Sequence, residues 1–180
     1  MHAPGMSVES YYSRRRDLPV ALSSGQLELA IDIAAAADTD LCHQPLFREP
    51  YVCAVREDHP EVGNRLTLEQ YLELGHIHVS SRRRGLGLVD LQLNRLGHER
   101  RIQLRLQHYL VVPAVVRSTN LALTVPSHWA KRAGMKVLDL PFELPELESH
   151  LLWHRSADGD QANRWLRERI VAQCSRLEMA

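Results

Sequence analysis

The stretch RIQLRLQHYLVVPAVVRSTNLALTVP, residues 101–126, decides the fold class because it holds a strand, a helix and a second strand in close succession. Apolar and polar side chains alternate over residues 101–107, as they do in a strand with one buried face. Residues 110–118 are typical of a short helix with Pro113 near its first turn, and residues 120–125 are typical of another strand. This alternation predicts an α/β protein.

An ionisable ring continues the apolar face of the first of these strands. His108 falls in phase with Ile102, Leu104 and Leu106, where a buried side chain is expected. A neutral histidine there donates one hydrogen bond, and a protonated one pairs with a carboxylate. Two interpretations stay open: a ligand contact at the carboxyl end of the strand, or a buried histidine bonded to a backbone group.

The N-terminal part of the chain shows the same alternation. A strand is expected over residues 6–13, followed by a helix over residues 15–26 with Asp17 as its N-cap and Gly25 at its end. A further strand over residues 27–34 would complete a β-α-β unit with a parallel pair of strands.

Local signals predict the remaining elements. Residues 51–55 have the pattern of a buried strand that the following EDHP turn ends. Thr67 and Gln70 form a capping-box pattern that opens a helix ending at Gly75. Strands are expected over 76–81, 135–141 and 148–154, and helices over 126–134 and 158–177, while a loop over 82–87 opens a helix that stops at Gly97. The side chains expected to face inward are Leu88, Leu91 and Leu96 in that helix, and Ala162, Trp165, Leu166 and Ile170 in the closing one.

The order of elements predicts two lobes with a cleft between them. The chain leaves one lobe and returns to it through two apolar strands, YVCAV (51–55) and HLLWH (150–154). We therefore expect lobe I to comprise residues 1–55 and 148–180, and lobe II residues 56–147. Ligands of open α/β sheets bind at the carboxyl ends of strands, near helix N-termini.

Composition argues against several classes of function. Lys and Arg together number 22, as do Asp and Glu, so the chain has no net positive field to attract nucleic acid. Its three cysteines are widely spaced, which argues against a disulfide framework and a metal site and favours a reducing cytoplasm. The sequence lacks a membrane-length apolar run, a signal-peptide core and the G-x-S-x-G, P-loop, G-x-G-x-x-G and H-E-x-x-H motifs. We expect no metal, cofactor or catalysis.

Many short motifs occur in an order that resembles a known family. They are Asp17-Leu18, Ala21-Leu22, Ser24-Gly25, Leu29-Ala30-Ile31, Pro45-Leu46-Phe47, Tyr51-Val52-Cys53 and His59-Pro60, followed by GLVDLQLNRLG (87–97), LLWH (151–154) and ANRWLRE (162–168). Nearly the whole chain is similar to the effector-binding domain of LysR-type transcriptional regulators. Its second half resembles the branch of this family that senses salicylate-like and nitroaromatic compounds.

The resemblance implies two Rossmann-like lobes around a small-molecule cleft, as in type II periplasmic binding proteins. It implies a cytoplasmic regulator that self-associates to dimers and tetramers and binds DNA only through a separate N-terminal winged helix-turn-helix. The sequence shows no counterpart of that domain or of the first strand and helix of the effector domain, so we expect an N-terminally truncated chain. The expected partner is a small aromatic or carboxylate-bearing effector, with no membrane.

The resemblance also assigns ligand contacts near the opening stretch. His108 and Tyr109 match a histidine and an aromatic residue of the aromatic-sensing branch, where the histidine faces the cleft. Thr119 matches a family threonine whose hydroxyl suits a polar ligand contact. The alternative for Thr119 is a turn hydroxyl that bonds to its own backbone.

Further candidate contacts lie in a loop and in the second crossover strand. Ser80 and Ser81 end the strand expected over 76–81, and Arg84 lies in the following loop, which opens a helix where backbone N–H groups can receive an anion. Trp153 matches a residue at the lobe crossover. The alternatives are a solvent-exposed loop for the first three residues and core packing for Trp153.

One other function shares the expected fold. A periplasmic-type solute-binding protein without enzymatic activity would also have two lobes and a cleft. It would need a secretion leader, which the sequence does not display.

Overall fold

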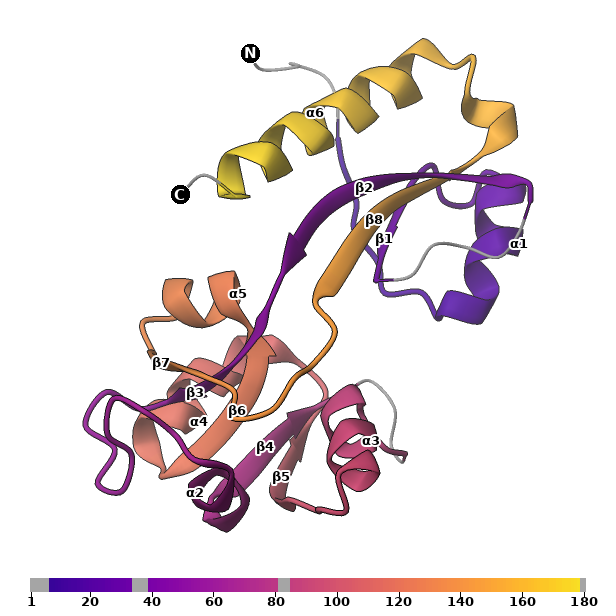
Figure 1. The fold of residues 1–180 in the computed structure, drawn as a ribbon. Helices are drawn as coiled ribbons and strands as arrows, with labels where there is room; N and C mark the ends of the chain where they lie inside the picture. The colour runs from indigo at the N-terminus through magenta and orange to yellow at the C-terminus, as the bar shows by residue number, and fades with distance from the viewer. Residues whose placement is uncertain (1–6, 34–38, 81–84, 179–180) are drawn as a thin grey trace. The chain divides into compact units, whose positions relative to one another are not determined.

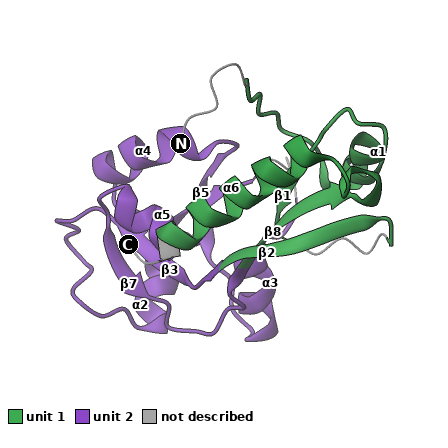
Figure 2. Ribbon diagram, turned by 90° about the horizontal axis from the view of Figure 1, so that it is seen from above, with its two compact units in different colours: residues 1–47, 148–180 green, residues 48–147 purple. Residues whose placement is uncertain are grey.

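The computed structural model describes residues 7–33, 39–80 and 85–178 (Figure 1). The chain divides into two compact units, residues 1–47 with 148–180 (unit 1) and residues 48–147 (unit 2) (Figure 2). Unit 1 is therefore built from both ends of the chain, and unit 2 from the continuous segment between them.

Unit 2 holds a five-stranded sheet in the order β5-β4-β6-β3-β7. Its strands are β3 (Tyr51–Val55), β4 (Gly75–Val79), β5 (Arg101–Leu106), β6 (Leu121–Pro126) and β7 (Lys136–Asp139). Strand β4 runs parallel to both β5 and β6, whereas β3 runs antiparallel to β6 and β7. The carboxyl ends of β4, β5 and β6 consequently meet at one edge of the sheet, which we call the carboxyl edge.

Helices cover both faces of this sheet. They are α2 (Leu68–Glu73), α3 (Leu88–Arg95), α4 (Val112–Ser118) and α5 (Ser127–Arg132), with a 3-10 turn η2 (Tyr109–Val111) before α4. One core joins Val112, Val116 and Ala130 of α4 and α5 to Val52 and Ala54. The other core joins Tyr71, Val89 and Leu93 of α2 and α3 to Cys53 and Val55. Strand β3 is apolar throughout because its alternate side chains enter the two different cores.

Unit 1 holds a three-stranded sheet in the order β1-β8-β2. Its strands are β1 (Ala30–Asp32), β2 (Leu41–Glu49) and β8 (Leu147–His154), and its helical elements are η1 (Arg15–Asp17), α1 (Leu18–Ser23), η3 (Arg155–Ala157) and α6 (Gln161–Glu178). Helix α1 packs on Leu41 and Leu152, and α6 packs on Leu46, Leu151 and Trp153. Leu151 and Leu152 are neighbours in β8, so the two helices cover opposite faces of the sheet.

Several local predictions are confirmed. The Thr67 hydroxyl accepts the Gln70 N–H at 3.2 Å and the Gln70 side chain accepts the Thr67 N–H at 2.9 Å, which is the predicted capping box. Gly97 ends its helix at φ +78°, a conformation that disfavours other residues. Gly75, however, opens β4 rather than ending α2, and its missing side chain leaves room for Gln103 and Leu121.

The predicted strand over residues 6–13 is wrong for the described part of that range. Residues 7–14 form no regular element, and Val8 and Tyr12 are exposed. Within the described residues no strand pairs with this segment, and alternation alone supplies no backbone partner. The predicted parallel pair is therefore also wrong: β1 pairs antiparallel with β8, from Ala30 opposite Leu152 to Asp32 opposite His150.

The inward faces of two helices also differ from prediction. In α3, Leu88, Leu91 and the following Leu96 are exposed, and the buried residues are Val89, Asp90 and Leu93. In α6, Ala162 is exposed, Trp165 and Leu166 are only half-buried, and Asn163 and Arg167 are buried, whereas Ile170 packs against the core of unit 1 as predicted. The apolar pattern failed because buried polar side chains of both helices have partners: Asp90 binds Arg100, and the Asn163 amide donates to the Glu28 carbonyl at 3.0 Å.

Candidate functional site

Polar and aromatic side chains gather at the carboxyl edge of unit 2. Ser80 follows β4, His108 lies two residues after β5, and Ser127 follows β6. Tyr51 opens the antiparallel β3 opposite Pro126 and so lies at the same edge. This is the edge at which open α/β sheets bind their ligands.

His108 lies outside the strand whose apolar phase it was predicted to continue. Strand β5 ends at Leu106, and His108 is an exposed, extended residue directly before η2. The alternative of a buried histidine bonded to the backbone is therefore wrong. An exposed imidazole at this edge is available to a ligand as a hydrogen-bond donor and acceptor.

Aromatic rings lie beside His108. The ring of Tyr109 packs edge-on against Trp129 at 5.2 Å between centroids, while 42% of the residue stays exposed. Burial raises the pKa of Tyr109 and that of Tyr51, so both phenols stay protonated near neutral pH. The next residue, Leu110, is almost fully exposed. The edge thus offers apolar surface together with neutral hydrogen-bonding groups.

Sequence reasoning missed a buried carboxylate at this edge. Glu49 accepts the His128 N–H at 2.8 Å, and His128 Nδ1 lies 3.4 Å from the same carboxylate oxygen. Glu49 therefore satisfies a free N–H at the start of α5 and fixes the position of His128. The available signal was an acidic residue directly before Pro50 and the buried strand.

The loop after β4 is described in part. The Ser80 N–H donates to the Leu106 carbonyl at 2.9 Å, which joins the carboxyl ends of β4 and β5. Ser81 and Arg84 lie outside the described residues. At the far end of the loop, the Gly87 N–H donates to the Asp90 carboxylate at 2.8 Å.

Thr119 is not brought together with His108 and Ser80. It precedes β6, whose first residue Leu121 pairs with Gly75 at the amino end of β4, so it lies at the opposite edge of the sheet. Its hydroxyl donates to the Val115 carbonyl at 2.9 Å and accepts the Leu121 N–H at 3.3 Å. This geometry matches the alternative interpretation, a turn hydroxyl bonded to local backbone.

Trp153 lies in unit 1, where it lines a hollow of about 580 Å³ together with Gln44, Asp158 and Arg167. Its indole N–H donates to Asp158 at 2.7 Å, and the Arg167 guanidinium stacks on its ring at 4.2 Å from the centroid. Only 8% of Trp153 is exposed. These contacts match the packing interpretation of Trp153.

Two buried ionisable side chains of unit 2, those of Cys53 and His76, are held in their neutral forms. Burial raises the pKa of the Cys53 thiol to about 12, so it stays protonated and is a poor nucleophile. Burial lowers the pKa of His76 to about 4, so its ring is neutral near pH 7. Cys42, Cys53 and Cys174, all among the described residues, form no disulfide. Within residues 7–33, 39–80 and 85–178, no three His, Cys, Asp or Glu side chains are placed to hold a metal ion.

Of the helices in the described part of the chain, none combines sufficient length with sufficient apolar character to cross a bilayer.

Comparisons with known proteins agree on one family. The family described as "LysR substrate binding domain" matches residues 2–175. The HTH-type transcriptional activator NagR of a Ralstonia species is 32% identical over 94% of this chain and 58% of its own length, and NahR of Pseudomonas putida is 32% identical over 92% and 57%. The regulatory domain of MexT, a transcriptional activator in Pseudomonas aeruginosa, superposes with a TM-score of 0.71 at 27% identity, covering 86% of this chain and 76% of that one. The chain thus spans about 58% of the length of these curated relatives.

Proposed function

Because the chain belongs to the LysR substrate-binding-domain family, we propose that it is the effector-sensing part of a LysR-type transcriptional regulator. The observation that carries this proposal is the family match over residues 2–175. NagR and NahR are transcriptional activators, which supports a regulatory rather than a catalytic role and gives no support to a solute-binding protein. DNA binding, self-association to dimers or tetramers and a cytoplasmic location are proposed for the regulator as a whole.

The effector in this proposal is a small aromatic or carboxylate-bearing compound. His108 supplies a hydrogen bond or, when protonated, an ion pair to a carboxylate. Tyr109, a partly exposed residue, supplies an aromatic ring at the next position. Both lie at the carboxyl edge of unit 2, and open α/β sheets bind ligands at this kind of edge.

The other candidate contacts predicted from the sequence belong to three different parts of the chain. Ser80, Ser81 and Arg84 are proposed as the anion-facing part of the site, since Ser80 lies at the carboxyl edge beside the end of β5. Trp153, in unit 1, is proposed to contact the effector through its apolar ring surface. It is not proposed as a polar contact, because its indole N–H is already bonded to Asp158. Thr119 is left out because it lies at the other edge of the sheet.

The two units are proposed to be the two lobes of the domain. Strand β3 belongs to unit 2, where it pairs with β6 and β7, so the first lobe boundary is proposed after Phe47 rather than after Val55.

A ligand screen with a matched pair of histidine variants tests the function. Thermal unfolding of the purified chain is measured with benzoates, salicylates, nitroaromatics and aliphatic acids, and hits are confirmed by calorimetry. A ligand at about a hundred times its Kd stabilises the folded state by roughly 2.7 kcal/mol, which raises Tm by several degrees. We expect a selective rise with aromatic carboxylates that His108→Ala removes.

The control is His98→Ala, which deletes the same side chain in the turn before β5, at the opposite edge of the sheet. It should bind the hit as the unchanged chain does. A rise in Tm that survives His108→Ala, or the absence of a rise with every compound class, would contradict the proposed site or the proposed effector class.

A further inference from the structure

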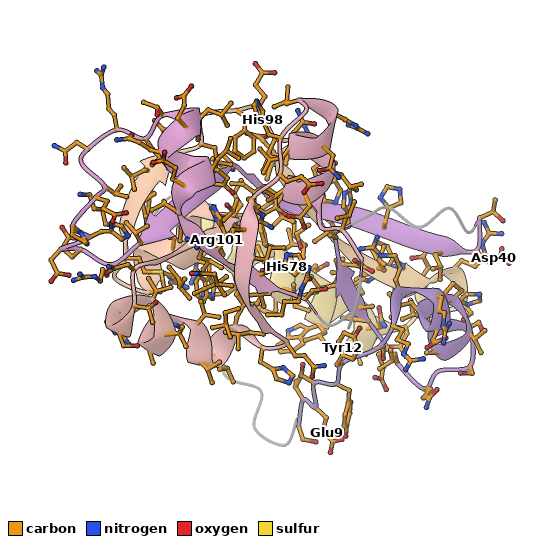
Figure 3. The ribbon with its side chains drawn as sticks, turned by 90° about the horizontal axis from the view of Figure 1, so that it is seen from below. Glu9, Tyr12, Asp40, His78, His98 and Arg101 are labelled. Carbon is orange, nitrogen blue, oxygen red and sulfur yellow. The ribbon has the colours of Figure 1, made fainter. Side chains whose placement is uncertain are left out.

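Arg100 and Asp90 form a buried ion pair in unit 2. Arg100 Nε and Asp90 Oδ1 are 2.7 Å apart, and the two side chains are only 3% and 7% exposed. Arg100 precedes the amino end of β5, whereas Asp90 lies in the first turn of α3, with its Oδ2 3.8 Å from Nδ1 of His78. Figure 3 labels His78, which lies near the carboxyl end of β4. The arginine side chain therefore links the two ends of this part of the sheet.

Stability alone does not account for such a pair. Removing two charges from water costs several kcal/mol per ion, and replacing a buried pair by apolar residues is often neutral or stabilising. Burial would raise the pKa of Asp90, but the hydrogen bond and charge of Arg100 hold that pKa below its usual value. The pair is thus ionised at neutral pH, and its contacts indicate what it does.

The second oxygen of Asp90 fixes the end of the β4–α3 loop. Oδ2 accepts the Gly87 N–H at 2.8 Å. Gly87 is itself closely surrounded: a Cβ there would lie 2.6 Å from Cε1 of His78 and 3.3 Å from Oδ2 of Asp90. Its backbone has an ordinary negative φ, so glycine is required by this close approach and not by conformation.

Both members of the pair lie near Nδ1 of His78. An NH2 nitrogen of Arg100 lies 3.4 Å from this atom, and Asp90 Oδ2 lies farther away, at 3.8 Å. Because a guanidinium can only donate, the nearer contact favours an accepting Nδ1 and a neutral ring with its proton on Nε2. His78 lies two residues before Ser80, one of the proposed ligand contacts.

We propose that Asp90 and Arg100 are positioning residues: together they hold Gly87 at the start of α3 and keep His78 as its Nε2–H tautomer. Their importance for ligand binding rests on the function proposed above, whereas the position of Gly87 and the tautomer of His78 are properties of the ligand-free chain. Failure of the positioning role can therefore be distinguished from failure of the proposed function.

The test compares the unchanged chain with the double variant Asp90→Leu/Arg100→Met and with Gly87→Ala. Hydrogen exchange is measured at the amides of Ser80, Gly85 and Gly87, and histidine tautomers are read by two-bond ¹H–¹⁵N NMR. In the double variant we expect Tm to change by no more than a few degrees, Gly87 exchange to rise about tenfold or more, and the His78 tautomer to become mixed. His150 is the internal control, because it lies in unit 1, where its Nε2 is 3.6 Å from Glu148.

Three results would overturn the positioning role. Unchanged Gly87 exchange together with an unchanged His78 tautomer would mean that the pair positions neither. A double variant that unfolds, or whose Tm falls by ten degrees or more, would mean that the pair acts as a stabiliser. Gly87→Ala, which alters no charge, should displace His78 and also raise loop exchange; if it leaves both unchanged, the close packing has no positioning role.

Binding of benzoate and salicylate is measured on the same proteins. If either binds the unchanged chain, we expect the double variant to weaken it at least tenfold, and undiminished affinity would overturn the positioning role for the site. If neither binds the unchanged chain, the proposed effector class fails, and the exchange and tautomer results still decide the role of the pair.

Discussion

His76 and Tyr71 are joined by a hydrogen bond in which the His76 Nε2–H donates to the Tyr71 carbonyl at 2.8 Å, and their rings lie 4.4 Å apart. The other ring nitrogen, Nδ1, is buried without a hydrogen-bond partner among the described residues. The ring is therefore accommodated only in its neutral form, which has a measurable consequence for stability.

Unit 2 should lose stability on mild acidification. Burial lowers the folded-state pKa of His76 to about 4, below the ordinary value of 6.5. The contribution of the neutral ring is fully present above pH 6.5 and is lost as the pH falls through 6.5 toward 4, because protons then bind the unfolded chain more tightly. The loss from this group is of the order of 3 kcal/mol at most. Urea unfolding at a series of pH values measures it.

His76→Phe isolates this contribution from that of the acidic groups. The phenyl ring keeps the packing on Tyr71 but cannot titrate, so the unfolding free energy of the variant should fall less steeply between pH 6.5 and 4. Equal slopes for the variant and the unchanged chain would show that His76 does not cause the acid sensitivity.

Arg167 should stabilise unit 1 through its contact with Trp153. The guanidinium lies 4.2 Å from the indole centroid and its NH1 nitrogen lies 3.1 Å from Asp158. Arg167→Met keeps most of the apolar stem and removes the charge, and we expect it to lower the unfolding free energy by about 1–2 kcal/mol. Arg169→Met is the matched control, since Arg169 stands farther from its ring, at 5.5 Å from Trp165. Equal losses in the two variants would contradict a specific role for the Trp153 contact.

Thr67 should matter to α2 through its hydroxyl. Thr67→Ala removes the acceptor for the Gln70 N–H and should cost about 1 kcal/mol, whereas Thr67→Ser keeps the oxygen and should cost much less. Equilibrium unfolding of both variants decides this. The capping role is excluded if serine destabilises as much as alanine does.

Thr119 should affect stability but not ligand binding. Thr119→Val deletes the hydroxyl that joins the Val115 carbonyl to the Leu121 N–H, and we expect a loss of about 1 kcal/mol. The affinity for a ligand found in the screen should stay unchanged, in contrast to that of His108→Ala. Calorimetric titration measures this affinity. If Thr119→Val lowers the ligand affinity without changing the unfolding free energy, Thr119 is a ligand contact after all.

Signals that act over a few residues predicted the fold well. The capping box at Thr67, the stop at Gly97 and the apolar run over 51–55 each depend on contacts within one element or on burial from both sides. The α/β class followed from these elements.

Features that depend on a distant partner could not be predicted. Residues 7–14 alternate like a strand but no described strand pairs with them, and α3 turns Asp90 inward because Arg100, ten residues later, compensates its charge. His108 looked like a continuation of β5, yet the strand ends two residues earlier. Glu49 was missed because its role depends on the start of α5, far along the chain.

The β1-β8-β2 order also constrains how the chain acquires its structure during synthesis. Strands β1 and β2 do not pair with each other; β8 lies between them and is made about a hundred residues later. All five strands of unit 2 have left the ribosome before β8 has, so the internal unit can complete its sheet while the N-terminal segment still lacks its central strand. A chain interrupted anywhere between residues 50 and 146 would leave β1 and β2 as separate ribbons with unsatisfied edges, open to pairing with the wrong neighbours.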